Sequence, residues 1–539
     1  MKLLHRFEWA LAILATLLLV CLHVFFISHA GGLWRDEINT VAVSTIPGFR
    51  EFLHWLDFDS FPILWMLIMR GWHAVGLGSD LTLRILGCMV GLCLVGALWF
   101  NARAFRVGVP FFSLALFAFN PCVIRYGDSL RGYGLGMCLI ILSFAAMWRL
   151  VQNPSKQNTV WACVIALLSV HTLYYNSFLL FAICSGGVAV CLRHRWWKRI
   201  GVLLGIGAVA AVSVTVYIPV FQRSKNWSPL FKTPGLGPAW YWQKLSESLS
   251  PSGFLPVWIW VAVFAVVLVL GAVSFLPSTR RFALANQQQD IALFSAVAVS
   301  VGAAVYYIFL HRLSYITQPW YYLAFMALFA VAADSSLALV VNRYATRIIR
   351  LVMVASLMAV SLPAAMASVR TRMTNLDLVA AELARLVDKD DFVLVAVWYN
   401  GVTFNRYYRG AARWETLPPI NDHRFHRPDL LLPYMTAPDQ RATLNQLYAQ
   451  IQATLAGGHR IWLVGGLNFL QPDEQPLILP PAPNSAIGWQ LGGYQLSWST
   501  QAGEFLQTHA LRGDVIPVPA TQPVSDYESS KLMALSGWQ

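Results

Sequence analysis

The sequence predicts a polytopic α-helical membrane protein that ends in a small extracytoplasmic α/β domain. Hydrophobic residues make up 57% of the 539 residues and charged residues only 12%, about half the charged fraction of an ordinary soluble domain. Apolar runs of roughly 17–25 residues, the length that crosses a bilayer, recur along the first two thirds of the chain. From about Asn375 onward the composition becomes polar, and helical and strand-like patterns alternate.

The first apolar run, Trp9 to Ser28, follows a short basic N-terminus and has no convincing small-residue cleavage site. Because further apolar runs follow it, we interpret it as a retained signal-anchor helix and not as a cleaved signal peptide. The other crossings are predicted over residues 82–101, 108–123, 134–151, 158–174, 177–192, 199–219, 255–276, 290–310, 319–341 and 348–367. With the N-terminus inside, these eleven crossings place the C-terminus outside.

Basic residues indicate this orientation. The short loops assigned to the cytoplasm, together with the N-terminus, hold 15 Lys and Arg residues, and their acidic residues are Glu8 and Asp290. Short-loop basic density marks the cytoplasmic side of a membrane protein. The apolar stretch over residues 61–76 is short and interrupted by Arg70. As a twelfth crossing it would move every basic loop outside, so it is predicted to be an interfacial helix in the first external loop.

The net charge of +13 is unevenly distributed. From Asn375 onward there are 15 acidic and 11 basic residues, whereas the preceding part holds 11 acidic and 28 basic ones. This excess is a topology signal and favours contact with anionic membrane lipids. It does not predict nucleic-acid binding, since no basic block or base-stacking module accompanies it. The eight cysteines lie in or beside apolar segments and form neither a disulfide framework nor a zinc-like spacing.

The C-terminal part reads as an α/β domain. "NLDLVAAELARLV" has helical spacing, and "FVLVAVW" follows as a short buried strand. The helical stretch "DQRATLNQLYAQIQATLAGG" leads into a second strand, "RIWLVGG". We therefore predict two domains, a transmembrane domain over residues 1–370 and an extracytoplasmic domain over residues 371–539.

Polar and aromatic residues gather in the loops assigned to the outside. The clusters are "GGLWRDEINT", "LDFDSFP", "VIRYGDSLRGYG", "HTLYYNS", "FQRSKNWSPLFKTPG" and "HRLSYITQPWYY". Each has a structural explanation as well as a functional one. Asp36 and Glu37 would solvate a helix end, and Asp128 and Arg131 would form a surface ion pair. The tyrosines would belong to the interfacial aromatic belt, and His171 would make a hydrogen bond at the interface.

The functional interpretation of these clusters is a pocket at the outer membrane face. Carboxylates there can act as general bases on a hydroxyl group. Arginines can hold a phosphate in the headgroup layer, and aromatic and small polar groups suit a sugar ring. This combination predicts transfer of a sugar from a lipid-phosphate carrier to an acceptor hydroxyl. Two alternatives are a lipid-linked-sugar transporter or flippase without catalysis and a membrane-anchored assembly or sensor protein. A transporter would place polar groups at mid-membrane and show internal repeats, and neither is evident.

The order of "LWRDEINT", "DFDSFP", "LTLRILGCMVGLCLVGALWF", "NPCVIRYGDSLRGYGLG" and "HTLYYNS" resembles the GT-C glycosyltransferases of the protein O-mannosyltransferase type. It is similar to bacterial family 39 members and, more distantly, to the aminoarabinose transferases that modify lipid A. The resemblance covers roughly residues 1–370 and implies a GT-C membrane fold.

The resemblance also implies site residues. Asp36 matches the catalytic base that deprotonates the acceptor hydroxyl, and Glu37 matches its partner. Asp59 belongs to the second motif, where Phe61 replaces the usual histidine. With Asp59, the residues assigned to substrate binding are Arg84, Tyr126, Asp128, Arg131, Tyr133, His171, Tyr175 and Arg312.

Enzymes of this type use a polyprenyl-phosphate sugar as donor and invert the anomeric configuration in one displacement. One base then suffices, unlike the two carboxylates of a glycoside hydrolase. No metal or other cofactor is expected for this type, although a metal site built from Asp36, Asp59 and Asp128 stays open as an alternative. The acceptor is a lipid, a glycan or a protein, and the sequence leaves this choice open.

The topology can be tested with a cysteine at Asp388 in a chain that lacks the eight native cysteines. We expect Asp388→Cys to react with a membrane-impermeant thiol reagent applied to intact cells, because residue 388 lies in the predicted external domain. Lys156→Cys, in a predicted cytoplasmic loop, is the matched control and should be protected. Protection at position 388 would rule out the eleven-crossing arrangement.

Overall fold

The computed structural model describes residues 2–233, 235–250, 254–274, 286–340 and 344–539. Packing between its elements divides the chain into two compact units. The helical unit comprises Met1–Ser28, Phe61–Ile218 and Gly235–Val369, and the α/β unit comprises His29–Ser60, Pro219–Pro234 and Arg370–Gln539. Each unit is described by itself. Most of the basic loop that begins at residue 277, and residues 341–343 at the end of one predicted crossing, lie outside the described residues.

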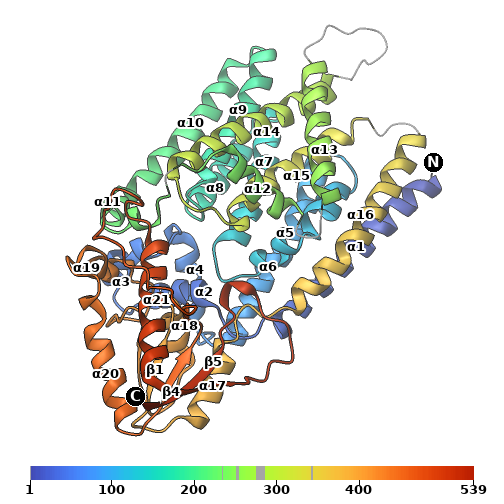
Figure 1. The fold of residues 1–539 in the computed structure, drawn as a ribbon. Helices are drawn as coiled ribbons and strands as arrows, with labels where there is room; N and C mark the ends of the chain where they lie inside the picture. The colour runs from blue at the N-terminus through green and yellow to red at the C-terminus, as the bar shows by residue number, and fades with distance from the viewer. Residues whose placement is uncertain (1, 234, 251–253, 275–285, 341–343) are drawn as a thin grey trace. The chain divides into compact units, whose positions relative to one another are not determined.

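Long apolar helices make up the helical unit (Figure 1). Within the described residues, nine stretches are long and apolar enough to cross a membrane, which supports a multi-pass membrane protein. They are α1 (Lys2–His29), α5 (Asp80–Phe105), α7 (Tyr133–Gln152), α9 (Asn176–Arg193), α10 (Trp197–Val214) continued by α11 (Ile218–Ser224), α13 (Phe254–Val273), α14 (Asn286–Leu313), α15 (Leu323–Leu337) with the turn before it, and α16 (Tyr344–Arg370).

Two predicted crossings are helical but shorter than expected. Residues 158–174 correspond to α8 (Lys156–Val170), which has 15 residues. Residues 108–123 contain a π-helical turn, Ser113–Ala118, followed by α6 (Pro121–Gly127). The buried Asp334 carboxylate accepts hydrogen bonds from the main-chain N–H groups of Phe112 and Ser113, at 2.8 and 3.0 Å. These bonds satisfy donors that an interrupted helix leaves free. Eleven crossings and their orientation stay a prediction.

The predicted interfacial stretch forms α4 (Ile63–Ala74), a helix of 12 residues that is not among the nine candidate spans. Its first turn is held within the helical unit, because Leu64 N–H donates to the His171 carbonyl at 3.0 Å. The Trp65 indole donates to the Leu130 carbonyl at 3.0 Å. The segment is therefore a short helix that is hydrogen-bonded to other parts of the helical unit, and its place at the membrane interface stays a prediction.

The α/β unit is built on a five-stranded sheet with the order β2-β1-β3-β5-β4. The strands are β1 (Phe392–Val395), β2 (Arg413–Thr416), β3 (Ile461–Val464), β4 (Ala510–Ile516) and β5 (Leu532–Trp538). β1 pairs in parallel with β2 and β3, whereas β5 pairs antiparallel with β3 and β4. The strands β1 and β3 are buried along their whole length, which explains why both read as continuous apolar runs.

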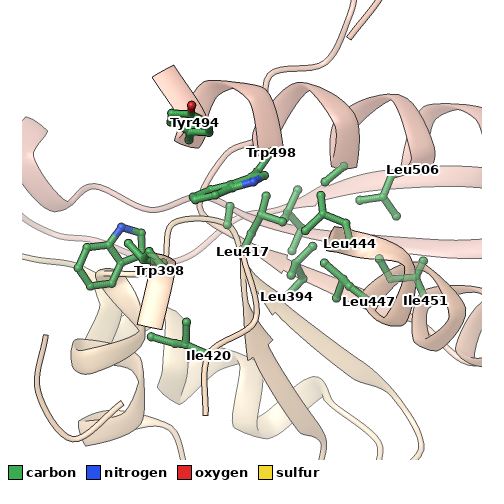
Figure 2. Packing of buried hydrophobic residues seen from close by; sticks show 14 of the residues in the cluster. Leu394, Trp398, Leu417, Ile420, Leu444, Leu447, Ile451, Tyr494, Trp498 and Leu506 are labelled. Atoms are coloured by element: carbon green, nitrogen blue, oxygen red, sulfur yellow. The ribbon is translucent and has the colours of Figure 1, made fainter. Parts of the chain in front are cut away.

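Alternate residues of the central strands feed two hydrophobic cores. Leu394 and Leu463 point into the core shared with α20 (Asn445–Ala456) and α21 (Leu491–His509), part of which Figure 2 shows. Val393 and Trp462 belong to the opposite core, with α17 (Leu376–Leu386) and α18 (Asn400–Tyr407). The period of two along each strand thus places helices on both faces. The remaining helix of this part, α19 (Leu432–Thr436), precedes α20.

The predicted helices and strands of the C-terminal part are confirmed as α17, β1, α20 and β3. The strands β2, β4 and β5 were not predicted, and most of β4 is exposed. Two segments that the sequence assigned to the transmembrane domain belong to the α/β unit in the structure. The first, after α1, forms α2 (Arg35–Ser44) and α3 (Phe49–Trp55), and α2 packs against α18. The second contributes Leu230 to the core that contains Leu394 and Leu463.

Removing the largest side chain of that core should destabilise the α/β unit. Trp498 on α21 is fully buried, so Trp498→Ala should lower the free energy of unfolding by about 3–5 kcal/mol. The measurement is urea-dependent pulse proteolysis of the purified full chain, followed at the fragment after residue 370. Leu496→Ala on the same helix removes a side chain that is 44% exposed, and should change stability by no more than about 0.5 kcal/mol. Equal losses for the two variants would contradict the assigned core.

Candidate functional site

The predicted Asp-Glu pair occupies the first turn of α2. Trp34 is the N-cap, and the Glu37 carboxylate reaches back to accept the Trp34 N–H at 3.3 Å. Acidic side chains in a first turn also interact favourably with the helix dipole. Glu37 is fully buried, whereas the Asp36 side chain is 24% exposed. Asp36 is thus the accessible carboxylate of the pair, and Glu37 caps the helix that carries it.

Glu528, near the C-terminus of the chain, holds the start of α2. Its Oε2 accepts the main-chain N–H of Arg35 at 2.9 Å, and the Arg35 guanidinium donates to the Tyr527 carbonyl at 2.6 Å. The same guanidinium lies over the Tyr399 ring, 4.4 Å from its centroid. One main-chain donor at the start of α2 is therefore satisfied by a carboxylate 493 residues away.

The Glu528 carboxylate is itself buried. Its Oε1 accepts the Thr374 hydroxyl at 2.9 Å, so both carboxylate oxygens are used. Burial raises the pKa of this group from 4.5 to about 7, although the Arg35 guanidinium and main-chain N–H oppose the shift. Removing a carboxylate from water disfavours its charged form, which is the cause of the rise.

Asp59 supports the flank of α2. Its Oδ2 accepts hydrogen bonds from the Asn39 amide at 3.0 Å and from the Thr40 hydroxyl at 2.7 Å. The Asn39 Oδ1 in turn accepts the His426 N–H at 2.6 Å. Asp59 is 7% exposed, and Asn39 and Thr40 are buried. A predicted substrate-binding residue is thus part of a network that joins α2 to the loop around His426.

In the helical unit, Asp128 forms a buried pair with a residue that the sequence analysis did not single out. The His23 Nδ1 lies 2.8 and 2.9 Å from the two oxygens of the Asp128 carboxylate. Arg84 is close enough to interact with the same carboxylate electrostatically. The pair fits against α5 because position 91 is glycine, and a Cβ there would collide with both side chains. His23 lies within the first span, where ionisable residues are costly unless paired.

Arg131 packs on the first of several aromatic rings that lie close to one another. The Arg131 guanidinium lies over the Phe61 ring, 4.4 Å from its centroid. Tyr133 packs edge-on against Phe61, with centroids 5.0 Å apart, and Tyr126 lies 4.7 Å from Trp320. Phe61 stands where the family pattern has histidine, so in this chain an aromatic face takes that position beside the arginine.

The other predicted residues of the helical unit are placed differently. Tyr175 is buried and packs edge-on against Tyr306, with centroids 5.7 Å apart. The Nδ1 of His171 lies 2.6 Å from the Tyr217 hydroxyl, as its structural interpretation expects. Arg312 is exposed at the C-terminal end of α14.

The structure therefore brings Asp36, Glu37 and Asp59 together in the α/β unit. It brings Arg84 and Asp128 together in the helical unit, where Arg131 packs on Phe61, and Phe61, Tyr133 and Tyr126 form one chain of ring contacts. Sequence reasoning missed Glu528, the Asn39–Thr40 pair and His23. A histidine inside an apolar span is a signal that was available for His23, and polar residues three and four positions after Asp36 were a signal for Asn39 and Thr40. Nothing in the sequence around Glu528 points to α2.

Among the described residues, no group of three or more His, Cys, Asp or Glu side chains is placed to hold a metal ion. All eight cysteines are free.

The fold is that of a multi-pass α-helical membrane protein with an α/β unit. It is the GT-C fold, which the resemblance of the sequence motifs implied. The structure is similar to ArnT from Cupriavidus metallidurans bound to undecaprenyl phosphate, with a TM-score of 0.51 and 14% identity over 98% of both chains. The apo state of that protein gives the same values. An Archaeoglobus fulgidus oligosaccharyltransferase tethered with an acceptor peptide has a TM-score of 0.43 and 12% identity, over 85% of this chain and 69% of its own. No family model and no curated protein matches the sequence.

The raised pKa of Glu528 predicts a pH-dependent stability. The unfolded carboxyl releases its proton near pH 4.5 and the folded one near pH 7. The stability that this group contributes is therefore fully present below pH 4.5 and is lost as pH rises through about 7. Glu528→Gln keeps an acceptor for Arg35 but cannot ionise. We expect the difference in unfolding midpoint between this variant and the wild type to change across that pH window, measured on the purified chain. A constant difference from pH 4.5 to 8 would contradict the assignment.

Proposed function

We propose that the protein transfers a sugar from a polyprenyl-phosphate donor to an acceptor hydroxyl at the outer face of the cytoplasmic membrane. The observation that carries this proposal is the fold, which is shared over 98% of both chains with ArnT, a protein whose structure holds undecaprenyl phosphate. Asp36 lies in the first turn of α2, the helix that follows the first span, and this position supports the proposal.

The cationic and aromatic cluster of the helical unit is proposed to bind the donor. Buried guanidinium groups form strong, directed hydrogen bonds to phosphate, and Arg84 and Arg131 are 4% and 6% exposed. Tyr126, Tyr133 and Tyr175 supply ring faces and hydroxyl groups that suit a sugar. In this proposal the Asp128 carboxylate, paired with His23, balances part of the positive charge of Arg84 as the phosphate enters. Arg312, at the end of α14, is proposed to meet the carrier phosphate at the interface.

Asp36 is proposed to act as the general base. Its carboxylate takes the proton from the acceptor hydroxyl as that oxygen bonds to the anomeric carbon. The bond between the anomeric carbon and the phosphate oxygen breaks, and the polyprenyl phosphate leaves with the electron pair. A single displacement inverts the configuration and needs one base. Glu37 is proposed to act through Asp36 by capping α2, and Asp59 by holding its flank.

Asp36→Asn should lower the rate of sugar transfer by at least about 100-fold, because a general base contributes about 10²- to 10⁴-fold. The measurement is transfer of labelled sugar from synthetic polyprenyl-phosphate donors to envelope fractions, using the purified chain. The amide keeps the size of the side chain, so the amount of folded protein should stay unchanged.

Asp390→Asn is the control, because Asp390 is an exposed acid of the α/β unit outside this network. It should transfer sugar at the wild-type rate. Wild-type transfer by Asp36→Asn would show that Asp36 is not the base.

A further inference from the structure

A groove crosses the surface of the α/β unit beside α2. It consists of three hollows of about 430, 670 and 350 Å³. The first and second share Asn405 and Arg424, and the second and third share Asn421 and Leu430. The shared lining residues show that the three hollows adjoin one another, and together we call them the groove. Each hollow is of the size that small-molecule and saccharide ligands occupy.

The groove begins on the face of α2 turned away from Asp59. Ile38, Val41, Ala42 and Thr45 line it and are spaced as one face of a helix. Asn39 and Thr40, which bond to Asp59, lie on another face of the same helix. A ligand in the groove would therefore contact α2, but on a different face from Asp36, which lies one turn before Thr40.

The groove concentrates positive charge in a part of the chain that is otherwise acidic. After Asn375 the chain holds 15 acidic and 11 basic residues. Five of those 11 basic residues line the groove, but only two of the 15 acidic ones do. The basic residues are Arg406, Arg409, Arg413, Arg424 and Arg427, and the acidic ones are Asp422 and Glu415, with Glu51 added from α3. This asymmetry favours an anionic ligand.

Several guanidinium groups are held in place before any ligand arrives. Arg424 and Arg427 both pair with Oδ2 of Asp422, at 2.9 and 2.8 Å, and Arg427 also pairs with Asp429 at 2.7 Å. Arg409, just after α18, donates to the main-chain carbonyls of Tyr408 and Arg406, both at 2.7 Å. Groups fixed in this way lose less conformational entropy on binding.

Amide side chains accompany the arginines and narrow the choice of ligand. The lining includes Asn405, Asn421, Gln446 and Gln450, together with the ring of Tyr434. Amides donate and accept at once, which suits the hydroxyl groups of a sugar. A membrane lipid headgroup would engage the charge but would leave this run of amides without a role, so the lining favours a saccharide that carries carboxylate or phosphate groups.

We propose that the groove binds an acidic saccharide chain, and that this chain is the acceptor, held by the groove at a place apart from Asp36. The acceptor role of this chain rests on the proposed function, whereas its binding to the groove does not depend on that function. The arginines pair with the anionic groups, the amides bond to hydroxyl groups, and the apolar face of α2 packs against the sugar rings.

The test is binding of tetragalacturonate, a saccharide with carboxylates, to the full chain in detergent, compared with neutral maltotetraose. We expect tetragalacturonate to bind at least about tenfold more tightly, and Arg409→Gln with Arg424→Gln to remove that preference, since each lost charged pair costs about 1.4 kcal/mol or more. Arg385→Gln with Arg512→Gln is the matched control, because both arginines are exposed and neither lines the groove. That control should bind like the wild type.

Three results would overturn the proposal: equal binding of the two saccharides, equal losses in the two double variants, or groove-dependent binding of phosphatidylglycerol vesicles without binding of tetragalacturonate. Asp36→Asn should bind tetragalacturonate normally. Binding without any sugar transfer by the wild type would thus refute the proposed function and leave the groove standing. Transfer to acidic glycans that is unaffected by the Arg409 and Arg424 changes would refute the groove alone.

Discussion

The buried carboxylate of Glu528 fixes where α2 begins. A helix N-terminus has main-chain N–H groups without partners inside the helix. Here one of them, that of Arg35, donates to the Glu528 side chain, which lies just before the last strand, β5. Two further contacts depend on α2 starting at Arg35. The Glu37 carboxylate accepts the Trp34 N–H, and the Asp59 carboxylate accepts the Thr40 hydroxyl, so each contact needs its α2 residue at a fixed distance from the start of the helix. The position of Asp36 therefore follows from the folding of the α/β unit.

This dependence gives the α/β unit a physical role. The segment after the first span, residues 29–60, folds in one compact unit with residues 370–539. The α2 helix packs against α18, and residues of both helices line the arginine-rich groove. One helix thus connects the proposed base with the proposed acceptor groove, and both are assembled by contacts within the α/β unit.

Sequence patterns predicted the features that depend on local composition. Apolar runs marked the spans, and the all-buried strands β1 and β3 stood out because both faces of the sheet are covered. The exposed strand β4 has no such pattern and was missed. The same limit applies to the site. Asp36 and Glu37 were found through motif order, but Glu528 and His23 act through partners 493 and 105 residues away, which no local pattern encodes.

The most direct test of this account is amide hydrogen exchange of residues 35–44 in the intact chain, compared between the wild type and Glu528→Ala. If Glu528 holds the start of α2, exchange should become faster in residues 35–44 and stay unchanged in α20, which packs against the far core of the sheet. Unchanged exchange in residues 35–44 would contradict the account, because α2 would then keep its position without the carboxylate.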